Sequence, residues 1–434
     1  MTSEVAGYDE AYVWVWLPGA TEPVVAGRLQ AHDGIIAFNY GQSYRKRPDA
    51  IPLYLPELPL EAGTLPLLPG LSMPGCIRDA APDAWGRRVI LNRGIGAGSA
   101  AGHELPELAF LLESGSDRIG ALDFQRSATV HEPRTPINAS LDELVESAER
   151  VENGIPLTPE LDQALFHGSS IGGARPKALI EDGEAKYVAK FSSSSDLYSV
   201  VKGEYIAMRL AALCGLDVAP VSLVRAARKD VLLVERFDRV RAADGWARRS
   251  MVSALTLLGL DEMMARYASY QDLAEIVRHR FTEPAATLRE LFARIVFNIL
   301  CGNNDDHARN HAAFWDGAML SLTPAYDICP QGRSGQEATQ AMLISGDNRM
   351  SRIATCIEGA RHFLLTESEA IAIAEAQLRC IGENWGRVCE EARIDEVERA
   401  GLWGRQFLNP YAFTDLEGAA TGLKMLGDEI RAAR

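Results

Sequence analysis

Residues 298–316 read NILCGNNDDHARNHAAFWD and gather four asparagines, three aspartates and two histidines behind an apolar run. Phosphoryl transfer needs side chains of this kind, because a carboxylate must lie near the attacking hydroxyl and oxygen ligands must hold magnesium on the phosphates. Asp305 is the candidate for the first role, and Asn310 and Asp327 are the candidates for the second. Magnesium keeps several waters, so one amide and one carboxylate are a sufficient contribution from the protein.

The parts of a nucleotide site lie upstream, in a workable order. Gly172 and Gly173 lie in a loop where main-chain N–H groups can approach phosphate. Lys190, at the end of a strand-like run, can place a positive charge on the phosphates, and Glu204 can orient it through an ion pair. The segment ERFD (235–238) closes another strand-like run and can present backbone groups to adenine. The order of these parts predicts a nucleotide site.

The spacing of apolar residues predicts the elements that position these side chains. Residues 9–60 carry short alternating apolar stretches between Gly, Pro and Asp, which indicates an antiparallel sheet. The runs KALIE and AKYVAKF are joined by Asp182-Gly183, a dipeptide that favours a tight hairpin. A long apolar helix leads into the polar segment. A second hairpin, from HAAFW to AMLSLTP, would bring Asn310 and Asp327 onto one ion.

Composition limits the possible functions of the chain. Its 434 residues suit two or three domains, and 47% hydrophobic with 24% charged residues is ordinary for a globular protein. With 44 basic and 59 acidic side chains the net charge is −15, which argues against a protein that binds nucleic acid alone. Seven scattered cysteines without a CxxC pair are expected to be reduced. The absence of a signal-like start and of a long apolar run favours the cytoplasm and no membrane partner.

Six segments occur in an order that is typical of a known family: SSIGGARPK (169–177), AKF (189–191), EYIAMRLAALCGL (204–216), LLVERFDR (232–239), NNDDHARNHAAF (303–314) and LTPAYDICP (322–330). With these segments the chain resembles the HipA-type serine/threonine kinases, the toxin halves of bacterial toxin-antitoxin pairs. A further segment, APDAWGRR (81–88), looks like the N-terminal subdomain of that family.

The resemblance implies a role for each matching residue. Asp305 matches the catalytic aspartate, and Asn310 and Asp327 match the magnesium ligands. Ser170 matches a loop serine that is autophosphorylated in such kinases, which ejects the loop and silences the enzyme. A dianion among phosphate-binding N–H groups would compete with ATP, so this switch is physically reasonable. The residues expected at the ATP site are Gly172, Gly173, Ala174, Lys190, Glu204, Glu235, Phe237 and His307.

Two assignments stay open between neighbouring residues. Ser169 adjoins Ser170, so either hydroxyl can be the regulatory one. Asp306 adjoins Asp305, and the choice of Asp305 follows the register of the resemblance. Because adjacent side chains on an extended loop point apart, only one of the two aspartates should face the substrate.

Simpler interpretations compete with these motifs. The polar segment taken alone is also typical of a loop that follows a helix. His307 and His311, four apart, would suit a metal nuclease, but a third ligand at sensible spacing is missing. His307 is expected instead to brace the loop by hydrogen bonds. The charges of ERFDR (235–239) can form a surface ion-pair set.

We therefore expect an α+β, HipA-like kinase fold, with a β-rich N-terminal subdomain, a mostly helical C-terminal lobe, and ATP and magnesium between them. The expected domains are 1–125, a nucleotide-binding part at 141–240, and the helical lobe at 241–434. The expected reaction transfers the γ-phosphoryl group of ATP to a protein serine or threonine. In the family that the chain resembles, the targets include aminoacyl-tRNA synthetases, whose phosphorylation arrests growth.

Two other functions remain as alternatives. The chain can act mainly as a co-repressor that is held on DNA by a small helix-turn-helix antitoxin, whose basic surface would complement the acidic chain and make the DNA contact indirect. It can also be a kinase for a small molecule such as a sugar or lipid, because the phosphate-binding parts would look the same. A neighbouring gene for a short basic helix-turn-helix protein favours the toxin and co-repressor functions, and its absence favours the small-molecule kinase.

Overall fold

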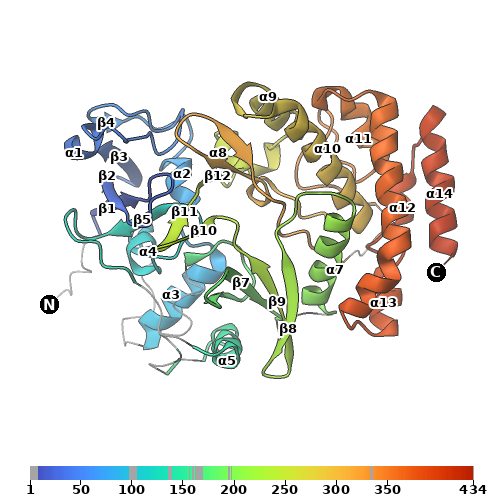
Figure 1. Ribbon diagram of the computed structural model, residues 1–434, viewed down its shortest axis with the longest axis horizontal. Coiled ribbons are helices and arrows are strands. Elements are labelled where there is room, and N and C mark those ends of the chain that lie inside the picture. Colours follow the sequence, from blue (N-terminus) through green and yellow to red (C-terminus); the bar gives the residue numbers. More distant parts are fainter. Residues whose placement is uncertain are drawn as a thin grey trace. The chain divides into compact units, whose positions relative to one another are not determined.

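The computed structural model describes residues 8–96, 105–134, 139–155, 157–158, 161, 170–193, 196, 198–332, 335 and 337–433. The chain forms two compact units (Figure 1). The first unit consists of Met1–Ser195, Val224–Val252 and Phe314–Ala318, and the second consists of Asp196–Leu223, Ser253–Ala313 and Met319–Arg434. Sheets make up most of the regular structure of the first unit and helices make up most of the second, so the predicted α+β class is confirmed.

An antiparallel sheet of five strands forms the N-terminal part of the first unit. Ala11, Val13 and Val15 alternate along its first strand and are buried, which is the period-two pattern of a strand that covers a core. In sheet order the strands are β4 (Thr64–Leu65), β3 (Ile35–Tyr40), β2 (Val24–His32), β1 (Glu10–Val15) and β5 (Leu122–Gln125). The predicted antiparallel strands of residues 9–60 are thus present as β1, β2 and β3. The helices of this part are α1 (Gln42–Arg45), α2 (Gly75–Arg78), α3 (Ala84–Gly96) and α4 (Glu107–Glu113).

A second sheet has four strands in the order β6-β7-β9-β8. Its strands β6 and β7 form the hairpin that was predicted from Asp182-Gly183. The Asp182 carboxylate accepts hydrogen bonds from the N–H groups of Glu184 and Ala185, at 3.0 and 2.9 Å. Gly183 adopts a φ of 92°, a conformation that glycine takes without strain. The strands are β6 (Lys177–Glu181), β7 (Lys186–Phe191), β8 (Val221–Ala226) and β9 (Lys229–Glu235).

One face of this four-stranded sheet packs against α3 and α5 (Leu141–Glu152) (Figure 1). Ala178, Ala189 and Phe191 are buried on that face. Because strand residues alternate between faces, the cross-strand pair Lys177 and Lys190 lies on the opposite face. The other members of the core are Trp85, Val89, Leu144, Val145, Ala148, Val151, Ala226 and Val231.

Two smaller sheets follow. The strands β10 (Arg239–Ala242) and β11 (Gly245–Arg248) form an antiparallel ribbon. The strands β12 (Ser250–Ser253), β13 (Ala312–Trp315) and β14 (Leu320–Leu322) form a three-stranded sheet in that order. The Thr323 N–H donates to the Ala312 carbonyl, at 3.1 Å, so β13 and β14 form the second predicted hairpin.

Helices dominate the second unit, as the sequence predicts. The longest of those described, α12, lies against α7, α10 and α14 (Figure 1). A capping box starts α12, because Thr366 accepts the N–H of Glu369 and Glu369 accepts the N–H of Thr366. The helices are α7 (Val200–Leu213), α8 (Ala254–Leu257), α9 (Tyr270–Arg280), α10 (Pro284–Cys301), α11 (Ile353–Gly359), α12 (Glu367–Glu391), α13 (Glu396–Leu402) and α14 (Thr421–Ala432). Short 3-10 turns are η2 (Ala265–Tyr267), η3 (Ala308–Asn310), η4 (Ala360–Phe363), η5 (Pro410–Phe413) and η6 (Gly418–Ala420).

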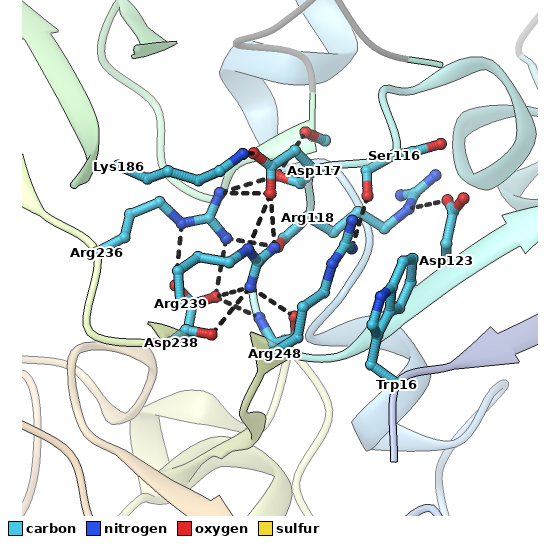
Figure 2. A network of polar contacts seen from close by, with 12 residues as sticks. Trp16, Ser116, Asp117, Arg118, Asp123, Lys186, Arg236, Asp238, Arg239 and Arg248 are labelled. Carbon is cyan, nitrogen blue, oxygen red and sulfur yellow. Dashed lines mark hydrogen bonds and ion pairs between the residues drawn. The ribbon is translucent and has the colours of Figure 1, made fainter. Parts of the chain in front are cut away.

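Asp117 and Asp238 form the centre of a buried ion network in the first unit (Figure 2). Arg236 and Arg239 each contact both carboxylates, at 2.7 to 3.0 Å, and each guanidinium-bearing side chain is 1% exposed. Lys186 also contacts Asp117, at 2.8 Å. The interpretation of the ERFDR charges as a surface ion-pair set is therefore wrong, because Arg236, Asp238 and Arg239 are buried. The two arginines also pair with Asp117, which precedes Arg236 by 119 residues.

The same network fastens the backbone of that segment. Arg236 donates to the Arg118 carbonyl, at 2.6 Å, and the Gly120 N–H donates to Asp238, at 2.7 Å. Burial acts to raise the pKa of Asp117, but the nearby cations, Arg236 first among them, hold it well below its usual range. The network therefore keeps the turn before β5 attached to the end of β9.

Replacement of Asp117 by asparagine should destabilise the first unit by roughly 3 to 5 kcal/mol, because two arginines then stay buried without their full counter-charge. Urea unfolding followed by tryptophan fluorescence measures the loss. The control is Asp49→Asn, which removes an exposed ion pair with Arg47 and should leave the midpoint unchanged. An Asp117→Asn midpoint equal to wild type at pH 7 would contradict this account.

The same variant has a predictable dependence on pH. Folding lowers the pKa of Asp117, so its contribution to stability is present above the unfolded value of about 3.9 and is lost as the pH falls below it. The difference in midpoint between wild type and Asp117→Asn should therefore be constant near neutral pH and shrink toward pH 3.

Candidate functional site

Helix α10 leads directly into the polar segment. Leu288, Leu291 and Ile295 lie on its buried face and hold it in the core of the second unit. The helix ends at Gly302, which adopts a φ of 73°, the left-handed conformation of a helix C-cap. A Cβ atom at this position would lie 2.6 Å from the backbone oxygen of Gln406. Gly302 therefore ends the helix and also allows this close approach.

Asp306 anchors the polar segment within the second unit. Its carboxylate is buried and accepts hydrogen bonds from the Tyr270 hydroxyl and from the Asn298 amide, the latter at 2.7 Å. The Nε2 atom of His311 lies 3.0 Å from the same carboxylate. Burial acts to raise the pKa of Asp306, but His311 and Tyr270 bring it below its usual value. Partners from α9, from α10 and from the segment itself thus fix this side chain.

Asp305 is exposed although its neighbour is buried. The Asp305 carbonyl accepts the His307 N–H, at 2.8 Å, and the Asn310 side-chain amide, at 3.0 Å, which holds the turn. Although Asp305 is exposed, the surrounding atoms partly desolvate its carboxyl group, and this raises its pKa. The negative charges of Asp327 and Asp306 raise it too, whereas His307 lowers it. Asp305 is thus exposed and Asp306 is buried, and the assignment of Asp305 as the base stays a prediction.

A hydrogen bond from a side chain ties the Asp327 segment to the same turn. The Tyr326 hydroxyl donates to the Arg309 carbonyl, at 2.8 Å. The Ala325 N–H donates to the Asp217 carbonyl, at 2.7 Å, which fixes the segment from its other side. Asp327 itself adopts a φ of 58°, an uncommon conformation that aspartate tolerates better than most residues. The second hairpin and these bonds bring Asp305 and Asp327 close enough to influence each other electrostatically.

Asn310 and Asp327 carry the donors that magnesium prefers. The Asn310 nitrogen is used by the hydrogen bond to Asp305, which leaves the Asn310 amide oxygen as the atom that can face a cation. One amide oxygen and one carboxylate fit a hydrated magnesium ion. Among the residues that the structure describes, no group of three or more His, Cys, Asp and Glu side chains is gathered for a metal.

The two histidines of the segment do not form a shared metal face. His311 is buried between Asp306 and Tyr270, with its Nε2 atom 3.1 Å from the Tyr270 hydroxyl. His307 braces the loop through its backbone, since its carbonyl accepts the Asn310 N–H at 2.8 Å. The His307 Nδ1 atom is buried and has no hydrogen-bond partner among the described residues. The main chain of His307 thus contributes to the predicted brace.

The glycine-rich loop belongs to the first unit and is described from residue 170 onward. Ser170 is buried, and its hydroxyl donates to the Asp117 carbonyl, at 3.4 Å. The alternative Ser169 lies outside the described residues. Gly173 adopts a φ of 99°, and Ala174 is exposed. The loop carries the expected backbone freedom, but the Gly173 N–H already donates to the Asp83 carboxylate, at 2.6 Å.

The other predicted nucleotide residues are divided between the two units. Lys190 lies on β7, and Glu235 ends β9, both in the first unit. Phe237 follows β9 and contacts the Phe314 ring edge to face, with 5.9 Å between the centroids. Glu204 is buried on α7, which belongs to the second unit. Because Lys190 and Glu204 belong to different units, their ion pair stays a prediction.

Sequence reasoning missed several residues that shape these loops. Lys177 ends the segment SSIGGARPK, and its ammonium donates to the Gly172 carbonyl, at 2.5 Å. Asp83 lies within APDAWGRR, and its carboxylate accepts the Gly173 N–H. Tyr270, which donates to Asp306, belongs to no motif in the sequence. The one available signal was that Asp305 and Asp306 are adjacent, so that one of the two carboxylates should point inward and need buried partners.

Two protein-family models match this chain. Residues 169–390, more than half of the chain, match the HipA-like C-terminal domain, and residues 15–125 match the HipA N-terminal domain. The chain belongs to the HipA family. Its first matched range contains the glycine-rich loop and the polar segment, and its second contains the segment APDAWGRR.

HipA-family relatives with curated names include three bacterial proteins. A putative kinase, Y4mE, from Sinorhizobium fredii is 27% identical over 345 residues, which cover 72% of this chain and 76% of the relative. The serine/threonine-protein kinase toxin HipA of Shewanella oneidensis is 28% identical over 37% of this chain and 42% of that protein. A putative kinase of Haemophilus influenzae is 27% identical over 37% of this chain and 52% of that protein.

A solved structure of a HipA protein has the same fold. It comes from the complex of HipA, HipB and operator DNA of Shewanella oneidensis MR-1, with a TM-score of 0.67 and 21% sequence identity. The comparison covers 97% of this chain and 100% of that one. The predicted HipA-like fold is thereby confirmed.

A membrane-spanning helix is not found in the described part of this HipA-family chain, where every helix is too short or too polar to cross a bilayer.

Gly302→Ala should destabilise the second unit by about 2 kcal/mol more than Gly404→Ala does. Both glycines have a φ of 73°, but a Cβ atom meets the Gln406 backbone only at position 302 and meets nothing within 4 Å at position 404. Each variant incurs the left-handed strain of about 1 to 2 kcal/mol, and only the first adds a steric clash. Urea midpoints of the two variants measure the difference. Equal midpoints would show that the helix end tolerates a side chain.

Proposed function

We propose that this HipA-family protein is an ATP- and magnesium-dependent protein kinase that phosphorylates serine or threonine and acts as the toxin of a toxin-antitoxin pair. The observation that supports this most is the polar segment, in which an exposed Asp305 hydrogen-bonds through its backbone to Asn310. Asp327 lies on a segment that is tied to the same turn. The names of the curated relatives agree with a kinase.

In this proposal the residues divide the work of phosphoryl transfer. Magnesium, when bound, would neutralise phosphate charge and orient the γ-phosphoryl group. Asn310 and Asp327 would hold the ion, and Asp305 would accept the proton of the attacking hydroxyl. The raised pKa of Asp305 suits a group that must take up that proton. Lys190 would contribute a positive charge to the phosphates, oriented by Glu204.

The adenine end and the loop complete the proposed nucleotide site. Glu235 and Phe237 would present the segment after β9 to adenine, and that segment is fixed by the buried ion network. The phosphate end of the site would be lined by Ala174, which is exposed next to Gly173, and by His307, which lies in the turn after Asp305.

Autophosphorylation of Ser170 is the proposed regulation. The Ser170 hydroxyl is buried against a backbone carbonyl, and a phosphoserine dianion in that place would be desolvated. The loop would therefore have to leave its position once it is phosphorylated, which would remove it from the nucleotide.

The proposed partners follow from the family and from charge. The Shewanella relative was solved with HipB and operator DNA, which supports a helix-turn-helix antitoxin for this chain and only indirect contact with DNA. The net charge of −15 favours such a basic partner. The substrate would be a cytoplasmic protein, with an aminoacyl-tRNA synthetase as the first candidate. A co-repressor without kinase activity and a small-molecule kinase are the competing functions.

Incubation with Mg-ATP should add one phosphate to protein that starts unphosphorylated, and the phosphate should map to Ser170. In Asp305→Asn the rate of phosphate incorporation should be lower by a factor of at least about 100, because the attacking hydroxyl loses its base. Intact-mass spectrometry with peptide mapping of 165–177 measures both. Absence of any gain in wild type would remove the autokinase from the proposal and favour the co-repressor or the small-molecule kinase.

Asp327→Asn should raise the magnesium concentration that gives half-maximal phosphorylation, on the order of tenfold, because a neutral amide replaces a charged ligand. The control is Asp316→Asn, an exposed turn residue of the same hairpin, which should leave the requirement unchanged. A magnesium titration of the phosphorylation rate separates the two. If both variants behaved like wild type, Asp327 would not be a magnesium ligand.

A further inference from the structure

The segment APDAWGRR places two residues directly on the glycine-rich loop, and the function proposed above gives this segment no role. The Asp83 carboxylate accepts the Gly173 N–H, at 2.6 Å. The Trp85 N–H donates to the Gly173 carbonyl, at 3.2 Å, and the Trp85 indole N–H donates to the Lys177 carbonyl, at 2.9 Å. Both backbone polar groups of Gly173 are therefore bound by one short segment of the N-terminal part.

We propose that Asp83 is a positioning residue for the nucleotide: together with Trp85 it docks the glycine-rich loop in the conformation that receives the ATP phosphates. This inference rests on the proposed kinase function. Asp83 itself would not touch the nucleotide. Its carboxylate would instead supply the charge-assisted hydrogen bond that holds Gly173, at a site separated by 90 residues in the chain.

A side chain at either docked position would have to displace a group that holds the loop. A Cβ atom on Gly172 would lie 2.9 Å from the Asp83 carboxylate oxygen. A Cβ atom on Gly173 would lie 2.2 Å from the Lys177 ammonium, and the φ of 99° would strain any other residue. The Lys177 ammonium donates to the Gly172 carbonyl, at 2.5 Å. The two glycines are thus contacted by an anion, Asp83, and by a cation, Lys177, at the start of β6.

The segment that holds the loop is anchored in a packed core. Trp85 is 1% exposed and packs with Val89 in the core between α3 and the four-stranded sheet. The Arg87 N–H donates to the Asp83 carbonyl, at 2.9 Å, so Asp83 stands immediately before the first turn of α3. Because helix and sheet share this core, the start of α3 next to Asp83 is anchored in packed structure. A loop attached to such a base is ordered before nucleotide arrives, which lowers the cost of binding.

The arrangement also assigns the phosphate contacts within the loop. The Gly173 N–H is already used by Asp83, so it is not a phosphate donor while the loop is docked. Phosphate would be met by the other main-chain N–H groups of the loop and by the lysines on the face of the sheet away from its core, Lys177 and Lys190. Asp83 thus holds the loop in one conformation, and the two lysines attract the phosphates.

Hydrogen exchange of the nucleotide-free protein tests the dock without any assumption about activity. Asp83→Ala should raise the exchange rate of the peptide that covers 170–178 on the order of tenfold, and Asp83→Asn should raise it less, because an amide oxygen still accepts the bond. Arg88→Ala, an exposed residue of the same helix, should leave the rate unchanged. Unchanged exchange in Asp83→Ala would overturn the dock.

Calorimetric titration with the magnesium complex of a non-hydrolysable ATP analogue tests the positioning role. Kd should rise on the order of tenfold in Asp83→Ala and a fewfold in Asp83→Asn, with Arg88→Ala equal to wild type. Val89→Ala, which weakens the same core, should lower the melting temperature and leave Kd unchanged well below it. A rise in Kd for Val89→Ala equal to that for Asp83→Ala would reduce Asp83 to a structural role.

Two outcomes separate failure of the dock from failure of the kinase proposal. If wild type bound no analogue, the proposed kinase function would be rejected. The hydrogen-exchange result would still show whether Asp83 holds the loop, because it is measured without nucleotide. If wild type bound the analogue and Asp83→Asn bound it more tightly, the carboxylate would be a competitor of phosphate, and the positioning role would be overturned.

Discussion

The buried carboxylate of Asp306 is the constraint on which the candidate catalytic site depends. Tyr270 from α9, Asn298 from α10 and His311 all converge on it, so the chain must turn at this point with one aspartate inward. Successive side chains on an extended segment point apart, and the anchored Asp306 therefore presents Asp305 outward. The two neighbouring residues have the same chemistry, and burial alone distinguishes them.

The first unit fixes its functional segments by the same physical device. Asp117 and Asp238 are held by Arg236 and Arg239, and this network fastens the segment that would receive adenine. Buried ion pairs seldom add much net stability, but breaking one partner leaves an uncompensated charge and is costly. Such networks therefore specify one arrangement of the backbone. The glycine-rich loop, in which Asp83 holds Gly173, uses a single charged hydrogen bond in the same way.

Much of this could be predicted from the sequence, because periodicity and turn residues act locally. The hairpin at Asp182-Gly183 and the helical C-terminal part are examples, and ordered motifs were sufficient to recognise the family. The partners of Asp306 could not be predicted, since Tyr270 lies 36 residues away in sequence and carries no motif. The burial of Arg236 and Arg239 could not be predicted for the same reason, because their counter-ion, Asp117, is brought to them only by the tertiary fold.

The unfolding free energies of Asp305→Asn and Asp306→Asn, measured side by side in urea, test the division between the two aspartates most directly. We predict that Asp306→Asn loses roughly 3 to 5 kcal/mol, because an amide N–H₂ would face the donors that now converge on a carboxylate. Asp305→Asn should be as stable as wild type or more so, since the substitution removes a negative charge beside Asp327 and Asp306. Equal losses in the two variants, or a larger loss for Asp305→Asn, would contradict the account.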